Sequence, residues 1–208
     1  MDFSLNEDHQ MFVKLARDFA KREISSKILE LDHKGEFPAE LIKKAWEAGL
    51  MNLCIPEEYG GLGVDPIAIA LIVEEVSYGC SGIGTSVMCN DLANAVIALH
   101  GSPEQKERYL KPFTEKPLLA SFGLTEAEAG SDNAAMTTYI KKREDGKYVL
   151  NGSKQFITNA TYADQFTVFC KLNSPKSQFM ACLVTPRQPA EGKIEVGKPE
   201  VKLGQHLS

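Results

Sequence analysis

Paired cysteines and metal-ligand clusters are absent from this 208-residue sequence. The cysteines are odd in number, scattered and never in a C-x-x-C pair, which argues against a disulfide framework and against a zinc site. They are Cys54, Cys80, Cys89, Cys170 and Cys182. Most lie beside apolar residues, so we expect buried free thiols. The four histidines show no metal-ligand spacing either.

Long apolar runs, a basic charge excess and a leader segment are also missing. No apolar run approaches the roughly 20 residues of a membrane helix, so we expect no membrane span. The formal net charge of −5 suggests neither nucleic acid nor anionic lipid as a partner. The start, Met1-Asp2-Phe3-Ser4, is acidic and no apolar signal core follows it. This pattern predicts a cytoplasmic, bacterial-style protein, or a processed mature form such as a mitochondrial matrix protein.

Ordinary globular composition is what remains, with 43% apolar and 25% charged residues. Apolar residues recur at helical spacing in the first part of the chain. We expect helices over residues 7–31 (with Asn6 as N-cap), 38–49, 66–78, from after Gly84 to 100, and from 103. The 66–78 stretch is so apolar that it predicts a helix buried on most sides. Ser102 and Gln105 have the spacing of a capping box before the last of these helices.

The apolar period switches towards two after Pro117. We expect strands over residues 118–124, 139–142, 147–150, 156–158, 166–172 and 179–185, with a possible short one at 194–196. Turn signals at 144–146 and 151–152 suggest hairpins. The predicted fold class is therefore α+β, with a helical domain over residues 1–115 and an antiparallel β-domain over residues 116–208.

The segment 121–138 (SFGLTEAEAGSDNAAMTT) leaves a predicted strand through a run of small residues. Thr125 and Ser131 supply hydroxyls and backbone N–H groups, and Gly130 permits close backbone approach or a positive φ. Such a loop can hold a polar ring edge and a phosphate without cationic side chains. A plain surface loop explains the same residues equally well.

The segment 151–160 (NGSKQFITNA) is a second candidate. A tight turn there presents Phe156, which can pack against a flat ring, and Thr158, whose hydroxyl can point at a ring nitrogen. Alternatively, Phe156 is a core residue and Thr158 simply favours a strand. A third glycine-rich stretch, residues 60–63, fits neither dinucleotide nor phosphate-loop spacing and indicates a turn between helices.

Taken together and in this order, these segments resemble the acyl-CoA dehydrogenase family. SFGLTEAEAGSD resembles its hydrophobic-Thr-Glu-x-x-Ala-Gly-Ser-Asp signature, and GSKQFITNA its Gly-x-Lys-x-Trp/Phe-Ile-Thr-Asn signature. Residues 55–61 and 100–106 match two further family segments, so the similarity covers the whole chain. The resemblance implies FAD as cofactor and α,β-dehydrogenation of an acyl-CoA to the trans-2-enoyl-CoA, as in fatty acid metabolism. The FAD-contacting residues that it implies are Phe122, Leu124, Thr125, Gly130, Ser131, Phe156, Ile157 and Thr158, with Ser131 also reaching the coenzyme A part of the substrate.

The family's catalytic base is a glutamate in a C-terminal helical domain, and this sequence ends at residue 208, before that domain. We therefore expect the N-terminal half of the enzyme, without its base or the C-terminal four-helix bundle, and inactive alone. Glu126, Glu128 and Asp132 lie near the flavin loop, and structural hydrogen bonding is expected of Glu126 and Asp132. In the terminal segment, His206 stands where the family usually has arginine.

Three functions remain open at this point. The first is a dehydrogenase whose longer form is active, with electron-transfer flavoprotein as electron acceptor. The second is a non-catalytic split subunit or remnant, and the third is a related acyl-CoA oxidase or nitroalkane oxidase. We expect a homo-oligomer, or a partner chain that supplies the C-terminal domain. Met88 and Leu92 are candidate lining residues of the acyl pocket, or else core.

Overall fold

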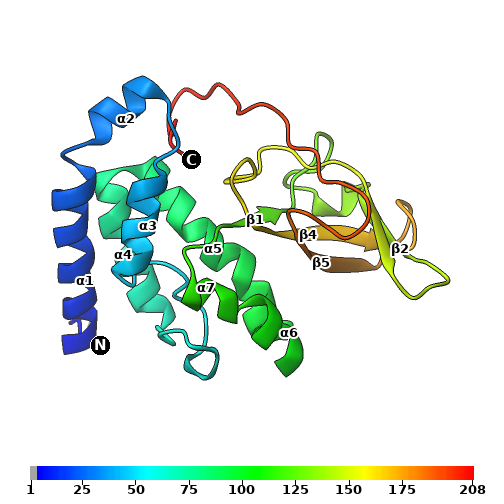
Figure 1. Ribbon diagram of the computed structural model, residues 1–208, viewed down its shortest axis with the longest axis horizontal. Helices are drawn as coiled ribbons and strands as arrows, with labels where there is room; N and C mark the ends of the chain where they lie inside the picture. Colours follow the sequence, from blue (N-terminus) through cyan, green and yellow to red (C-terminus); the bar gives the residue numbers. More distant parts are fainter. Residues whose placement is uncertain (1–3) are drawn as a thin grey trace. The chain divides into compact units, whose positions relative to one another are not determined.

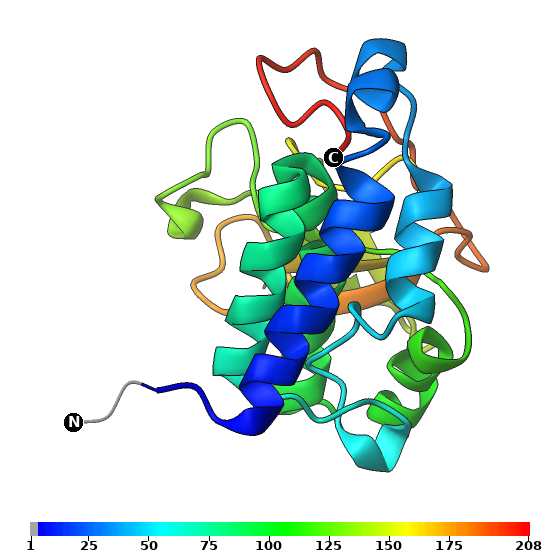
Figure 2. The same ribbon diagram turned by 90° about the vertical axis from the view of Figure 1, so that its left-hand side faces the viewer.

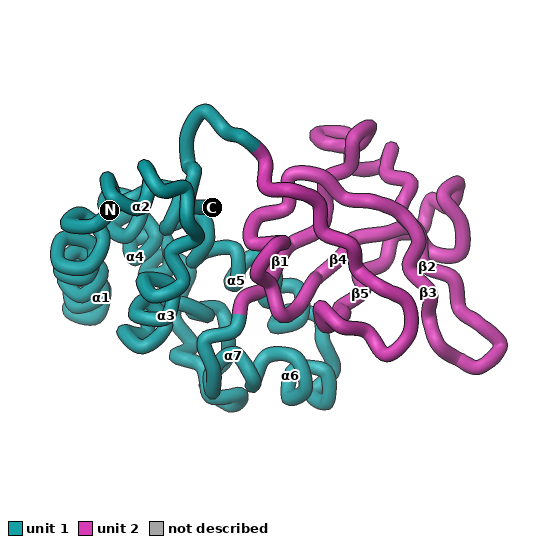
Figure 3. The backbone as a smooth tube through the Cα atoms, turned by 45° about the horizontal axis from the view of Figure 1, so that its top comes forward, with its two compact units in different colours: residues 1–118, 201–208 teal, residues 119–200 magenta. Residues whose placement is uncertain are grey.

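The computed structural model describes residues 4–208, so Met1–Phe3, on which the interpretation of the chain's start partly depends, lie outside the described residues. The chain forms two compact units (Figure 3). One contains the residues up to Leu118 together with Val201–Ser208, and the other contains Leu119–Glu200. The expected boundary at 115/116 falls at the end of the last helix, just before this division.

Helices make up the first unit (Figure 1). They are α1 Glu7–Phe19, the π-helical turn η1 Ala20–Ile24, α2 Ile28–Lys34, α3 Ala39–Glu47, the 3-10 turn η2 Glu57–Tyr59, α4 Pro66–Gly79, α5 Ser81–His100, α6 Pro103–Tyr109 and α7 Lys111–Glu115. The expected capping box is present at α6, where Ser102 and Gln105 exchange side-chain and backbone hydrogen bonds.

The first helix begins as predicted but does not run unbroken to residue 31. The Asn6 side chain accepts a hydrogen bond from the His9 N–H at 2.7 Å, so the N-cap is confirmed. The hydroxyls of Ser25 and Ser26 donate to the carbonyls of Ala20 and Arg22. Such side chains compete with the backbone for helical carbonyls, which favours the break before α2.

Helix α5 is the central helix of this unit. Helix α1 packs on α4, and α4 packs on α5 (Figure 2). Gly84 allows the α4–α5 contact, because a Cβ there would lie 2.1 Å from the Ser77 Oγ. Among the described residues, α5 is the one helix long and apolar enough to cross a membrane, but 61% of that stretch is buried inside the protein. Burial of this kind is typical of a core helix.

Buried polar side chains on α5 hold the segments that cross it. The Asn90 side chain donates to the Asn52 side chain at 2.9 Å and to the Leu118 carbonyl at 2.8 Å. The Ser86 hydroxyl donates to the Leu207 carbonyl at 3.3 Å. Leu207 is itself buried, so residues 201–208 pack with the helices, although the sequence interpretation placed them in the β-domain.

Helix α4 is less buried than its composition suggested. Its buried residues are Ala68, Ile72 and Val76, whereas Ile67 and Tyr78 are exposed. On α5, Met88, Leu92 and Leu99 are exposed as well, so Met88 and Leu92 are not core residues.

The second unit is a five-stranded sheet. Its strands are β1 Ala120–Gly123, β2 Tyr139–Lys142, β3 Tyr148–Asn151, β4 Gln165–Leu172 and β5 Met180–Pro186. Strand β5 pairs along most of β4, antiparallel to it. Strands β1 and β2 both pair with β4 in parallel, β1 with residues 165–168 and β2 with residues 171–172. The expected α+β layout is confirmed, but the sheet is mixed rather than antiparallel, because β1 and β2 reach β4 by crossovers instead of hairpins.

Two short predicted strands are absent from the described part of the chain. Residues 156–158 form a turn, and residues 194–196 are irregular. Phe156 has φ 58°, in the left-handed region that a strand cannot use. The predicted hairpin at 144–146 is present, because β2 and β3 pair antiparallel across it.

Candidate functional site

The loop between β1 and β2 leaves the sheet at a gap in its edge. Because β5 occupies one edge of β4, β1 and β2 must follow one another along the other edge, with residues 124–138 between them. Both ends of this loop are therefore fixed by the same central strand. A loop held in this way on a rigid sheet is a common position for binding residues.

The two segments singled out in the sequence lie side by side. The Gln155 N–H donates to the Thr125 carbonyl at 2.9 Å. The Ser121 hydroxyl donates to the Thr158 carbonyl at 2.8 Å. Two segments separated by about 30 residues in sequence are thus joined by direct hydrogen bonds at both ends of the contact.

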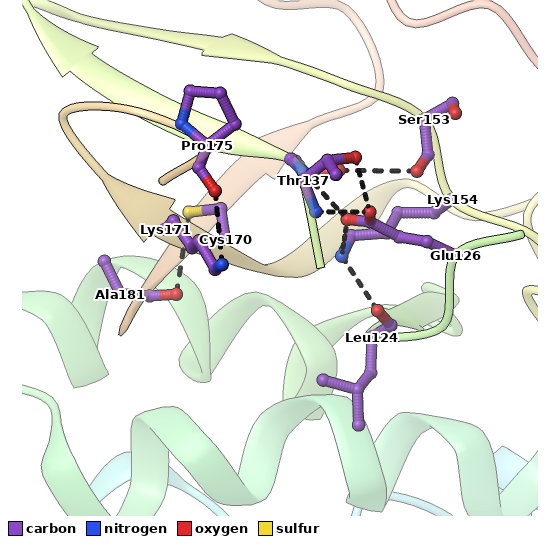
Figure 4. Close-up of polar contacts among 10 residues, drawn as sticks. Leu124, Glu126, Thr137, Ser153, Lys154, Cys170, Lys171, Pro175 and Ala181 are labelled. Carbon is purple, nitrogen blue, oxygen red and sulfur yellow. Dashed lines mark hydrogen bonds and ion pairs between the residues drawn. The ribbon is translucent and has the colours of Figure 1, made fainter. Parts of the chain in front are cut away.

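A nearly buried ion pair joins the same segments (Figure 4). The Lys154 Nζ lies 2.8 Å from Glu126 Oε1 and also donates to the Leu124 carbonyl at 2.8 Å. The side chains of Lys154 and Glu126 are 10% and 6% exposed. The ammonium therefore links the residue before Thr125 to the residue after it.

The Glu126 carboxylate has four hydrogen-bond donors. Besides Lys154, it accepts from the Thr137 N–H at 2.6 Å, the Thr137 hydroxyl at 2.9 Å and the Thr138 N–H at 3.0 Å. Burial alone would raise the pKa of Glu126, but the hydrogen bonds from Lys154, Thr138 and Thr137 outweigh it and lower the pKa to about 2. This carboxylate is a fixed anion with its lone pairs occupied, as expected for a structural role.

The other two acidic residues of the loop lie at its surface. Asp132 accepts a hydrogen bond from the Ala134 N–H at 3.1 Å and caps the short 3-10 turn η3, Asn133–Ala135. Glu128 is exposed. The structural hydrogen bonding expected of Glu126 and Asp132 is present at both.

Phe156 combines an unusual backbone with an unusual environment. Its φ of 58° is left-handed, and its side chain is 69% exposed. A bulky non-glycine residue in this region costs of order 1–3 kcal/mol and persists where surrounding structure holds it. The core interpretation of Phe156 is therefore wrong. An aromatic ring turned to solvent on a strained turn indicates a binding surface.

The remaining predicted contact residues form a mixed surface around this ring. Phe122, Leu124, Thr125, Ile157 and Thr158 are half-buried, and Gly130 and Ser131 are exposed. The hydroxyls of Thr125 and Ser131 make no hydrogen bond to any residue in the described part of the chain, 4–208. Gly130 does not take the positive φ that was one of its predicted uses, but a Cβ there would meet nothing within 4 Å.

This set of groups fits a flavin nucleotide. A flat aromatic face at Phe156, neutral donors at Thr125 and Ser131, and open space at Gly130 match a planar ring with a polar edge and a phosphate chain. Within residues 4–208 no group of three or more His, Cys, Asp or Glu side chains is placed to hold a metal ion.

Two residues of the site had no role in the sequence interpretation. Lys154 was part of a quoted motif, and Ser121 began another, but neither was assigned a function. The first signature contains three acidic residues, Glu126 among them, and the second contains one basic residue, Lys154. That complementarity was a readable signal, although no spacing rule links residues 28 positions apart.

The comparisons with known proteins agree with this geometry. Residues 6–116 match the family "Acyl-CoA dehydrogenase, N-terminal domain", and residues 121–207 match "Acyl-CoA dehydrogenase, middle domain". The 3-(aryl)acrylate reductase of Clostridium sporogenes is 41% identical over 200 residues, which cover 95% of this chain and 52% of the relative.

Solved structures show the same similarity. A chain from the electron transferring flavoprotein of Acidaminococcus fermentans has a TM-score of 0.91 and 38% identity, covering 100% of this chain and 54% of that one. An acyl-CoA dehydrogenase from Bacillus anthracis complexed with FAD has a TM-score of 0.86 and 32% identity, covering 98% of this chain and 35% of that one. The chain spans about half the length of the curated relatives it matches.

Proposed function

Because this chain belongs to the acyl-CoA dehydrogenase family, we propose that it forms the FAD-binding half of an enzyme that desaturates an acyl-CoA thioester between its α and β carbons. The observation that carries the proposal is Phe156, an exposed aromatic held in a strained turn beside the loop that contains Thr125. Strain of this kind at a surface turn is characteristic of binding sites.

Each predicted residue has a role in this proposal. Phe156 packs against the flavin ring, with Phe122, Leu124, Ile157 and Thr158 around it. The Thr125 hydroxyl donates to the polar edge of the ring. The backbone at Gly130 and Ser131 holds the phosphates, and Ser131 also contacts coenzyme A. When bound, FAD supplies the hydride acceptor for the β carbon, and neutral donors near the ring favour its reduction.

The base is assigned to residues beyond these 208. Glu126 is excluded from that role because its carboxylate is fully hydrogen-bonded, and a base must reach its proton within about 3 Å. We propose that the base and the C-terminal helices come from a longer form of the chain or from a partner chain. We also propose that the protein forms a homo-oligomer or pairs with that partner chain. The similarity to a chain from an electron transferring flavoprotein structure supports such a flavoprotein as electron acceptor. A cytoplasmic location is also part of the proposal.

A titration of the purified chain with FAD tests the binding half of this proposal. We expect quenching of flavin fluorescence on binding, and loss of that quenching in Phe156→Ala. Absence of saturable binding by the wild-type chain would refute the proposal. Phe179→Ala is the matched control, because Phe179 is 74% exposed in the same unit and lies outside the site.

Anaerobic addition of acyl-CoA tests the catalytic half. Bleaching of the bound flavin by butyryl-CoA, in the chain joined to its C-terminal partner, supports a dehydrogenase. Unbleached flavin under those conditions supports the non-catalytic alternative, and oxygen uptake during turnover supports an oxidase. The 41% identity to a 3-(aryl)acrylate reductase favours one further candidate, reduction of an aryl acrylate by pre-reduced flavin, which the same sample can be tested for.

A further inference from the structure

We propose that Glu126 and Lys154 are positioning residues of the FAD site, holding its two binding segments at a fixed separation. The inference rests on the proposed function, since it assigns these residues to the same cofactor. Neither side chain is itself placed against the flavin. Their effect on the cofactor passes through Thr125, which adjoins Glu126, and Phe156, which follows Lys154 by two residues.

The ion pair connects three separate stretches of chain. Lys154 belongs to the turn that presents Phe156, Glu126 begins the loop after β1, and Thr137 and Thr138 end that loop at β2. Through the contacts of the pair, the beginning and end of the loop and the neighbouring turn converge on one carboxylate. A further link between the turn and the start of this loop is the Gln155 N–H, which donates to the Thr125 carbonyl at 2.9 Å.

The turn that contains Lys154 is tightly packed on the side that faces the end of the loop. A Cβ at Gly152 would lie 2.3 Å from the Thr138 Oγ1 and 2.7 Å from the Thr138 Cα, so the turn lies directly against Thr138, the residue before β2. The Thr138 hydroxyl donates to the Ser153 carbonyl at 3.3 Å. With the turn closed against Thr138, the Lys154–Glu126 pair acts together with the Gln155 N–H bond to the Thr125 carbonyl to hold Phe156 at its distance from Thr125.

Only a carboxylate can satisfy this junction. An ionised Glu is acceptor-only and offers about four lone-pair sites, all of which are used here. A glutamine at 126 would present an amide NH₂ to donors, and a methionine at 154 would leave the Leu124 carbonyl without its side-chain donor. Either change is expected to let the two segments shift relative to one another, without touching a residue assigned to contact FAD.

The test uses the full 208-residue chain with FAD as the probe. We expect Lys154→Met to raise the dissociation constant for FAD about tenfold or more, the effect of losing a charge-assisted hydrogen bond. We also expect it to blur the vibronic structure of the bound flavin's absorption band, which reports the ring's surroundings. Lys154→Arg keeps the charge and is expected to restore both readouts in large part. Lys147→Met is the matched control, because Lys147 pairs with Glu191 at the surface of the same unit.

The outcomes separate the two proposals. A wild-type chain that fails to bind FAD removes the proposed function and this inference together. A wild-type chain that binds, with Lys154→Met equal to it in affinity and spectrum, overturns the inference alone. A loss of affinity that only follows the unfolded fraction, with a normal spectrum of bound flavin, also overturns it. If Lys154→Met does not fold, Glu126→Gln carries the same comparison, with Glu128→Gln as its control.

Discussion

Two buried carboxylates, Glu126 and Asp91, differ in their hydrogen bonding, and their pKa values are shifted in opposite directions. Glu126 has a donor for each of its lone pairs, and its pKa is lowered to about 2. Asp91 accepts a hydrogen bond from the Cys54 N–H at 2.7 Å through one oxygen, while its other oxygen is buried with no partner among the described residues. Burial raises the pKa of Asp91, and the hydrogen bonds from Cys54 only partly oppose this. The two residues therefore affect stability with opposite dependence on pH.

Acid is predicted to weaken the β unit through Glu126. The folded pKa of about 2 lies below the ordinary value of 4.5, so this stabilisation is complete above pH 4.5 and is lost as the pH falls through 2. The expected total is about 3 kcal/mol. This contribution is measured by urea unfolding followed by circular dichroism, in wild type and in Glu126→Gln. The pH series runs from about 6 to about 2, the range over which the contribution is lost. Equal pH slopes in the two proteins would contradict the prediction, and Glu128→Gln serves as the exposed control.

Asp91→Asn is predicted to stabilise the helical unit at neutral pH. A raised folded pKa means that Asp91 favours folding below its unfolded pKa, and that this contribution is lost as the pH rises through the folded pKa. At pH 7 the buried charge of Asp91 therefore lowers the free energy of unfolding. Asparagine keeps an acceptor for the Cys54 N–H without that charge. We expect a gain of about 1 kcal/mol that shrinks as the pH is lowered. Fluorescence of Trp46, the single tryptophan, reports unfolding of this unit.

Phe156→Gly is predicted to separate stability from binding. Glycine adopts a φ of 58° without the steric cost that phenylalanine carries, so the β unit should gain about 1 kcal/mol. FAD affinity should fall, because the exposed ring is lost. Thermal unfolding and FAD titration on the same preparation measure both effects. A variant that is less stable than wild type would show that the turn is not strained.

The sequence singled out two segments that the structure places side by side, but it did not predict their conformations. The resemblance identified Thr125, Ser131 and Phe156 as neighbours, and the structure brings their two segments together. It did not predict the left-handed φ of Phe156, since alternation of residue types suggests a strand and does not report a local turn. It also left Lys154 without a role, because the partner of a buried lysine depends on the tertiary fold.

At the scale of elements, Gly84 determines how closely α4 and α5 pack. Gly84→Ala would place a methyl group 2.1 Å from the Ser77 Oγ and 3.0 Å from the Ser77 Cα, so the helices must move apart. Overpacking of this kind costs about 1–3 kcal/mol. We expect a lower urea midpoint by Trp46 fluorescence. Gly197→Ala, where a Cβ meets nothing within 4 Å, should leave the midpoint unchanged.

Element boundaries were predicted where a local signal exists. Asn6 and the Ser102–Gln105 capping box begin helices by side-chain hydrogen bonds that only nearby residues supply. The break after α1 and the parallel pairing of β1 and β2 with β4 lacked such signals. The break depends on the Ser25 and Ser26 hydroxyls, which donate to helical carbonyls. The parallel pairing depends on crossover connections, which no turn motif predicts.

At the scale of the whole molecule, the chain's last described residues belong with its first ones. Residues 201–208 return to the helical unit (Figure 3). Leu207 is buried, and the His206 Nδ1 lies 2.8 Å from the Asp32 Oδ1. The sequence interpretation assigned this segment to the β-domain because it follows the predicted strands in the chain. Order along the chain does not show which unit a tail packs against when a short irregular connection allows it to return.

The outward faces of α4 and α5 lead to a prediction about association. Tyr78 is 83% exposed and Leu99 is 74% exposed, with Ile67 on the same helix as Tyr78 also open to solvent. Exposed apolar groups along two neighbouring helices favour association, since burying apolar surface contributes about 25 cal/mol per Å². We therefore expect the 208-residue chain to self-associate at concentrations on the order of 50 μM, within the weak range for small interfaces.

Sedimentation velocity across a concentration series measures this association. Tyr78→Lys combined with Leu99→Lys should shift the distribution towards monomer, because an ammonium group resists burial. Leu29→Lys is the matched control, since Leu29 is 75% exposed but lies on α2. If the wild-type chain stays monomeric throughout the series, or if Leu29→Lys has the same effect as the double variant, these faces do not drive association. A concentration-dependent wild type with a monomeric double variant would locate the contact on α4 and α5.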